Sequence, residues 1–337
     1  PTTAGTLSFI RDYASLGMGL STTLSPGWTH DQESRLIFPD GPGGEDGAVL
    51  WKLHTANQFV FTIEQDGTYT PATGLLATLT EVSGDETYYT VTDAAQKVYT
   101  YDSDGRIVSF ADATGNEWTY NYNLDGNLSQ IDANEGASYL IYSYDTSGRV
   151  TSVVDQTGRT VTFGYDGNGD LSSVVDVLGQ TWTYTYDSSH FLLAVIDPDG
   201  IVLERNEYDS QGRVVRQYDG ENNLIAAISY NSDGTSTVTD ALGYSYIYTF
   251  DELGAATNEL DPSGASTETV YLLDYRPFTI NNALGYSTDL SWSPNGANLT
   301  RVVDDEGNQV DFTYDDLNNL VTVVDPLDYL TTYAYDG

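Results

Sequence analysis

Carboxylate and amide side chains two residues apart are the arrangement in this sequence that could bind a hard cation. Oxygen ligands at positions i and i+2 of a short loop are a common way of binding calcium. None of these pairs continues into a loop that ends in a bidentate glutamate, and turn formation alone explains them. The sequence therefore predicts no cofactor, with calcium as the alternative left open. The candidate ligands are Asp102, Asp104, Asp166, Asn168, Asp170, Asp197 and Asp199.

The residue types of a catalytic centre are present but scattered. The three histidines are His30, His54 and His190, and none has a second histidine at the spacing of a metal site. No G-x-S-x-G, phosphate-loop or H-E-x-x-H motif occurs. Adjacent acids such as Asp304 and Asp305 are expected by chance in a chain with 50 acidic residues and favour solvated turns over a glycosidase pair. We therefore expect no enzyme activity, and we expect His30 to serve packing or hydrogen bonding.

The charge balance excludes several classes of partner. Fifty acidic residues against twelve lysines and arginines give a net charge of −38, which repels phosphate backbones and anionic lipid headgroups. No run approaches the roughly 18 apolar residues that a membrane-spanning helix needs. Cysteine is absent from the sequence, so disulfides and thiolate metal sites are not available. The sequence predicts a protein without nucleic-acid partners and without membrane insertion.

The elements that carry these side chains are short repeats. An aromatic residue recurs every 20 to 22 residues, so that eleven complete units fill residues 101–334 and a twelfth begins at Tyr335. A unit this short cannot bury its own apolar face, so neighbouring units must stack into one continuous core. The repeat starts are Tyr101, Tyr122, Tyr144, Tyr165, Tyr186, Tyr208, Tyr230, Phe250, Tyr271, Trp292, Tyr314 and Tyr335.

Each unit has the pattern of a β-hairpin. Residues 144–164 contain two Asp-x-x-Gly tetrads, 145–148 and 155–158, which are typical of tight turns closed by a glycine. Between such turns, residues 181–186 alternate threonine with tryptophan or tyrosine, which predicts a strand with one aromatic face. Two strands per unit give roughly 22 strands, and twisted open sheets rarely exceed about ten without curling. The predicted fold class is all-β, with antiparallel hairpin repeats of 20–22 residues coiled into a β-spiral or shell.

The first hundred residues differ from the repeats. Residues 58–63, 87–91 and 97–101 are rich in aromatic, Val and Thr residues and predict strands. Repeat arrays need an atypical terminal unit that covers the exposed edge. We therefore expect residues 1–100 to form an amino-terminal β region that caps the array, and residues 101–337 to form the array.

The motif at the start of each unit resembles a known family. Tyr-Asp-x-x-Gly-Arg at 144–149 and 208–213, with near matches at 101–106 and 165–170, is similar to the YD repeat of Rhs proteins, teneurins and the C component of insecticidal toxin complexes. Residues 7–15 followed by 27–30 resemble the segment that precedes the repeats in bacterial and archaeal Rhs-type chains. The residues that carry the repeat motif most clearly are Tyr144, Asp145, Gly148, Arg149, Tyr165, Asp166, Gly169, Tyr208, Asp209, Gly212 and Arg213.

This resemblance implies a YD shell, which in relatives encloses a toxin or forms an extracellular adhesive body. Our first hypothesis is a non-enzymatic structural scaffold, extracellular or at the cell surface, acting in adhesion or as part of a filament or shell. The alternatives are a toxin-encapsulating shell without its cleavage segment and toxin domain, and a carbohydrate-binding module. The expected partners are further repeats of the same protein, cell-surface glycans or an enclosed toxin. Because a twelfth unit begins at Tyr335, we expect an open sheet edge there, at which the array continues or a second subunit adds a strand.

Overall fold

The computed structural model describes residues 7–15, 23–41, 43–53, 58–133, 136–252, 254–272, 276–294, 296–315 and 318–335. These residues form thirty-one β-strands and contain no α-helix, which confirms the predicted all-β class. Accordingly, no helix in the described ranges is long and apolar enough to cross a membrane. His54 lies outside the described residues.

Six short strands precede the repeats. Strand β1 pairs with β2 in an antiparallel ladder, and β3 to β6 form a four-stranded sheet in chain order. The strands are β1 (Arg11–Tyr13), β2 (Trp28–His30), β3 (Arg35–Ile37), β4 (Ala48–Lys52), β5 (Gln58–Ile63) and β6 (Tyr69–Pro71).

The other twenty-five strands form one antiparallel sheet in which every strand pairs with the next along the chain. They are β7 (Ala77–Val82), β8 (Tyr88–Asp93), β9 (Val98–Tyr101), β10 (Ile107–Ala111), β11 (Glu117–Tyr122), β12 (Leu128–Ala133), β13 (Ser138–Tyr144), β14 (Val150–Asp155), β15 (Thr160–Tyr165), β16 (Leu171–Val175), β17 (Thr181–Tyr186), β18 (Leu192–Ile196), β19 (Val202–Tyr208), β20 (Val214–Asp219), β21 (Leu224–Tyr230), β22 (Ser236–Asp240), β23 (Ser245–Phe250), β24 (Ala256–Leu260), β25 (Ser266–Tyr271), β26 (Pro277–Asn281), β27 (Ser287–Trp292), β28 (Leu299–Asp304), β29 (Gln309–Tyr314), β30 (Leu320–Val324) and β31 (Leu330–Thr332).

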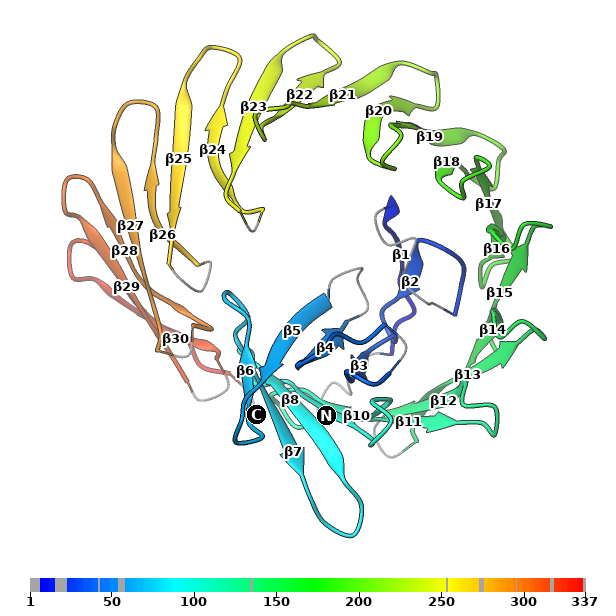
Figure 1. Ribbon diagram of the computed structural model, residues 1–337. Coiled ribbons are helices and arrows are strands. Elements are labelled where there is room, and N and C mark those ends of the chain that lie inside the picture. The colour runs from blue at the N-terminus through cyan, green and yellow to red at the C-terminus, as the bar shows by residue number, and fades with distance from the viewer. Residues whose placement is uncertain are drawn as a thin grey trace.

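This sheet bends into a ring. Strand β31 is the sheet neighbour of β7, and Figure 1 shows the strands arranged around a central space. Near the junction, a Cβ added at Gly296 would lie 2.6 Å from Cδ1 of Leu76, so the start of β7 packs against the turn between β27 and β28. The expected coiled shell of hairpins is confirmed, and its accumulated curvature brings the last strand back to the first.

A β-bulge recurs in the repeat and explains a break in the sequence pattern. In a regular strand, alternate residues face the same side, and this rule places Val153 on the opposite face from Val150 and Val154. The sequence is therefore compatible either with a bulge or with a strand that is buried on both faces. In the structure the register between β13 and β14 shifts at Tyr144, which is paired with Val150. The same shift lies beside Tyr165, Tyr186 and Tyr208. The bulge is therefore part of the repeating unit.

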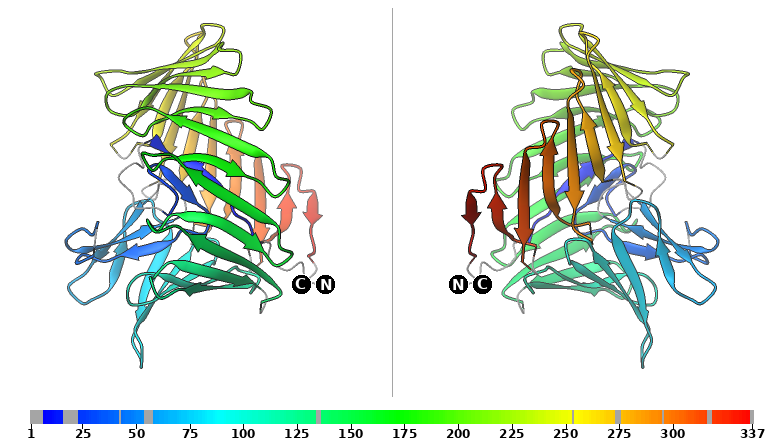
Figure 2. Two further views of the ribbon diagram at one scale, coloured as in Figure 1. Left: turned by 90° about the vertical axis from the view of Figure 1, so that its right-hand side faces the viewer. Right: turned by 90° about the vertical axis from the view of Figure 1, so that its left-hand side faces the viewer.

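The amino-terminal strands lie inside the ring and contribute side chains to both cores. Leu24 and Trp28 pack with residues of β11 to β18, while Leu36, Val49 and Trp51 pack with residues of β7 to β10. Figures 1 and 2 show these blue strands against the cyan and green part of the ring. We expected residues 1–100 to cover the edge of the array. Instead, residues before β7 cover its inner face, and β7 to β9 belong to the ring itself.

Candidate functional site

The inner face of the ring is the candidate functional site. Tyr184 is 6 % exposed and packs against Trp28 inside the ring, and Trp182 and Tyr186 pack against the same core. These three side chains share one face of β17, as the period-two pattern predicts. We call this face, and the faces that continue it through the strand register, the inner face.

The aromatic residue that starts most units bonds its hairpin to the preceding one. The hydroxyl of Tyr144 donates to the carbonyl of Leu128, and that of Tyr165 to the carbonyl of Val150, both at 2.7 Å. Each acceptor is the first residue after the preceding unit's first turn, which is the turn that follows the motif aromatic. The same bond is made by Tyr122, Tyr186, Tyr208, Tyr230, Tyr271, Tyr335 and the indole of Trp292.

The aspartate and glycine of the motif build the first turn. Oδ1 of Asp145 accepts bonds from the backbone N–H groups of Ser147 and Arg149, and Oδ2 accepts a 2.8 Å bond from Nε of Arg149. Gly148 has φ 77°, a conformation that favours glycine. Asp209, Gly212 and Arg213 repeat this geometry. The backbone N–H of Arg213 contributes most to holding the pKa of Asp209 below its ordinary value.

The arginine of the motif reaches the next hairpin. The guanidinium carbon of Arg149 lies 4.3 Å from the ring centroid of Tyr165, and that of Arg213 lies 3.9 Å from Tyr230. Nη1 of Arg149 also lies 3.2 Å from the place of a Cβ at Gly169, so a larger residue there would displace the guanidinium. Cation–π contacts of this kind stabilise by roughly 0.5–2 kcal/mol. The predicted motif residues therefore join both the turn and the two neighbouring units.

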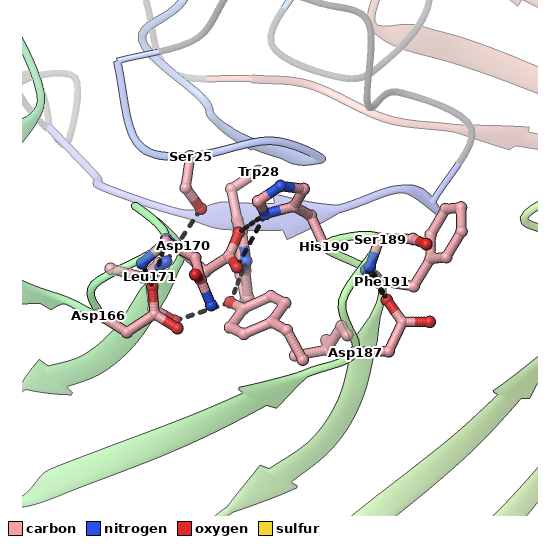
Figure 3. Close-up of polar contacts among 12 residues, drawn as sticks. Ser25, Trp28, Asp166, Asp170, Leu171, Asp187, Ser189, His190 and Phe191 are labelled. Atoms are coloured by element: carbon pink, nitrogen blue, oxygen red, sulfur yellow. Dashed lines mark hydrogen bonds and ion pairs between the residues drawn. The ribbon is translucent and has the colours of Figure 1, made fainter.

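Two departures from the motif meet in the structure. Asp170 occupies the arginine position of its unit, and His190 occupies the glycine position of the next unit with φ 69°. Nδ1 of His190 lies 2.9 Å from both carboxylate oxygens of Asp170, whose side chain is only 1 % exposed. Figure 3 shows this pair beside Ser25 and Trp28 of the amino-terminal segment. A similar contact joins Asn318, at the glycine position of its unit, to Asn298, two residues after Gly296 of the preceding unit, through a 2.7 Å bond.

The calcium candidates mostly bond their own turns. Asp102 accepts bonds from the N–H groups of Asp104 and Arg106 and from the Arg106 guanidinium, and Asp104 pairs with the same guanidinium at 3.0 Å. Asp166 accepts the N–H groups of Asn168 and Asp170, and Asp197 accepts that of Asp199. Within the described ranges, no group of three or more His, Cys, Asp or Glu side chains is placed to hold a metal ion.

The amino-terminal segment binds the inner face through Tyr13, Thr23 and Ser25, which accept a backbone N–H bond from each of three successive units. The N–H of Val150 donates to the carbonyl of Thr23 at 2.8 Å, that of Leu171 to Oγ of Ser25 at 3.1 Å, and that of Leu192 to the hydroxyl of Tyr13 at 2.9 Å. All three donors directly follow a first turn. The bulge frees these N–H groups from the ladder, and the covering segment satisfies them.

Aromatic contacts complete this interface. Nε1 of Trp28 donates to the hydroxyl of Tyr186 at 2.8 Å, and its ring lies 5.0 Å from that of Tyr184 in a T-shaped arrangement. Phe9 lies 5.5 Å from Phe163. Burial raises the pKa of Tyr186 and Tyr13, so both hydroxyls remain protonated at neutral pH. His30 is 2 % exposed, stacks on Phe9 and bonds Thr23, which confirms its predicted packing and hydrogen-bonding role.

Beyond β19 the inner face continues, and none of the described segments covers it. Tyr248 and Phe250 on β23 hold the positions that Tyr184 and Tyr186 hold on β17, yet Phe250 is 38 % exposed. None of the described residues of β20 to β31 is buried. The register places further apolar side chains on this face, namely Ile228, Tyr230, Val238, Tyr246, Tyr271, Leu290, Trp292, Val302, Phe312 and Tyr314.

Sequence reasoning missed the contacts that hold the covering segment. Ser25 and Leu171 lie 146 positions apart, and no periodic pattern relates them. The available signal was the double departure from the motif, because Asp170 and His190 stand at complementary positions of adjacent units. The sequence pattern places Asp170 among the calcium candidates and in the near match at 165–170, and it does not pair Asp170 with His190.

We expect the melting temperature to rise with sodium chloride and to gain nothing further from calcium. Salt screens the repulsion among the excess carboxylates, since the Debye length falls to about 3 Å at about 1 M. Calcium should add no effect because the candidate carboxylates already bond their own turns. Thermal melts across sodium chloride, then with calcium at fixed ionic strength, test both parts. A melting temperature insensitive to salt would contradict the screening argument, and an extra rise with calcium would reveal a binding site.

Comparisons with known proteins agree with this geometry. A family profile described as Teneurin YD-shell matches residues 78–242, and one described as RHS Repeat matches residues 292–328. The crystal structure of TcdB2-TccC3 without its hypervariable C-terminal region is 14% identical, with a TM-score of 0.44, over 88% of this chain and 20% of that one. The Photorhabdus luminescens Tc holotoxin pore gives the same values. This chain spans about a fifth of those proteins. No curated protein is significantly similar in sequence.

Proposed function

We propose that this chain, which belongs to the Rhs and YD-repeat family, is a non-enzymatic structural scaffold that works outside the cell or at its surface. The observation that carries the proposal is the inner face. Polypeptide of the chain itself covers it from β7 to β19, and the same apolar face continues uncovered from β20 to β31. A closed sheet with such an interior is suited to surrounding polypeptide.

The enclosing form of scaffold is favoured over a glycan-binding module by the direction of the aromatic side chains. Tyr184 and its equivalents lie on the inner face, where they pack on protein or continue that packing surface. A module that binds cell-surface glycans would present such rings outward. The polypeptide to be enclosed is either another part of the same protein or a toxin, as the resemblance to toxin-complex proteins suggests.

A fusion experiment tests enclosure. An unstructured, trypsin-sensitive polypeptide is fused after Gly337, and its digestion is followed on gels. We expect the fused polypeptide to survive about tenfold longer than the same polypeptide free in solution, because an apolar interior retains it away from the protease.

The matched control carries Tyr248→Glu and Phe312→Glu, which place two charges on the uncovered inner face. Both positions are only partly buried, so the ring should still fold, as circular dichroism would verify. The fused polypeptide should then be cut at the rate of the free one. Equal digestion in the native and charged chains would contradict enclosure.

A further inference from the structure

One rim of the ring carries exposed leucine and tyrosine side chains at regular intervals. They lie in the second turn of a unit, at the rim opposite the first turns. Leu242, Leu284 and Leu327 are 81, 81 and 74 % exposed, and each is followed two residues later by a tyrosine. Those tyrosines, Tyr244, Tyr286 and Tyr329, are 54, 54 and 68 % exposed. We call these three pairs the rim knobs.

The rim knobs are held by rigid turns. Oδ1 of Asp240 accepts bonds from the N–H groups of Leu242 and Tyr244 at 2.8 and 2.9 Å. Asn282 holds Leu284 and Tyr286 in the same way, and Asp325 holds Leu327 and Tyr329. Because the backbone is fixed, presenting these apolar groups to a partner involves little further ordering.

The knobs are evenly spaced. Leu242, Leu284 and Leu327 are 42 and 43 residues apart, which is two units and four strands, or about 19 Å along the rim. The turns between them are polar, at 261–265 and 304–308. Figure 1 shows the turns that join β24 to β25, β26 to β27 and β28 to β29 in one row along this rim.

From this geometry we propose that the rim knobs bind a second copy of this chain. An evenly spaced row of three is unchanged by a two-fold rotation about its middle member. Leu242 of one copy then meets Leu327 of the other, and Leu284 meets its own equivalent. Such a self-complementary patch is what a two-fold symmetric contact requires. This contact lies on the rim and is independent of what the inner face holds.

The charge of the rim sets the conditions for this contact. Under the same rotation the polar turn at 261–265 meets the turn at 304–308, which brings Asp261 toward Asp305 and Glu306. Repulsion between these like charges opposes the contact at low salt, and salt screens that repulsion. The same acidic groups repel anionic lipid surfaces.

The area of the contact is near the lower limit for a specific interface. Six leucines and six tyrosines from two copies would bury on the order of 1,000 Å². The pairing should therefore be reversible and favoured by salt.

Sedimentation of the full chain tests the proposal. We expect a concentration-dependent dimer of the 36.8 kDa chain in about 1 M sodium chloride, weaker in about 0.1 M. The triple variant Leu242→Ser, Leu284→Ser and Leu327→Ser should weaken association by more than about tenfold. Its melting temperature should match the native chain, because the three side chains are exposed.

Leu124→Ser is the matched control, since Leu124 is fully exposed in a first turn on the opposite rim and should not affect association. A native chain that stays monomeric at every salt and concentration overturns the proposal, as does a triple variant that still dimerises. Flotation with phosphatidylcholine vesicles supplies one more outcome. Vesicle binding by the native chain that the triple variant loses would identify the knobs as membrane contacts and also overturn it.

Discussion

Replacing Tyr184 by alanine should lower the free energy of unfolding by about 3–5 kcal/mol, whereas the same change at Tyr248 should lower it by less than about 1.5 kcal/mol. The two residues hold one position of the repeat, on β17 and β23. Tyr184 is 6 % exposed, packs against Trp28, and its hydroxyl accepts a 3.1 Å bond from Nη2 of Arg11. Tyr248 is only partly buried, so its removal leaves no comparable cavity.

Urea unfolding of both variants beside the native chain measures this difference. The residue type, the substitution and the place in the hairpin are the same at both positions. The difference between the two losses of unfolding free energy therefore measures the stabilisation that comes from packing against the amino-terminal segment. Similar losses at both positions would show that the inner face of β20 to β31 is as well packed as that of β17, and would remove the basis for an enclosing interior.

The repeat determines most of the fold because its signals are local. Asp145 and Gly148 specify a turn within four residues, and the alternation in β17 specifies which side chains share a face. Eleven repetitions of these signals predict one antiparallel sheet too wide to stay flat, which therefore coils. The position of the bulge, by contrast, could be found only from the observed register between β13 and β14. Valines at both odd and even positions of the strand are compatible with more than one pairing.

The candidate site was less predictable because its contacts are long-range and aperiodic. The hydroxyl of Tyr13 accepts a bond from the N–H of Leu192, 179 positions away. No pattern in either sequence segment predicts this contact. Tyr184 and Tyr248 have equal sequence contexts, yet only the first is covered. Burial on the inner face thus depends on where the described residues before β7 lie, which no repeat pattern encodes.

Replacing His190 by glycine should destabilise the protein by about 2–3 kcal/mol at neutral pH. The change removes the bonding partner of Asp170, which is almost completely buried, and an unpaired buried carboxylate is costly. Removing one member of a buried pair generally costs about 3–5 kcal/mol, and we lower that figure because the His190 side chain is 39 % exposed. Glycine accepts φ 69° without strain. The loss of stability therefore measures the contribution of the His190 side chain and not a change in backbone strain.

Asn318→Gly is the matched control for this prediction. Asn318 also departs from the turn glycine, with φ 65°, and bonds Asn298 of the preceding unit. No carboxylate is involved, so the loss should stay below about 1.5 kcal/mol. Adding Asp170→Asn to His190→Gly should recover much of the stability, because it removes the buried charge. A double variant no more stable than His190→Gly would show that packing, not the charge of Asp170, makes this pair matter.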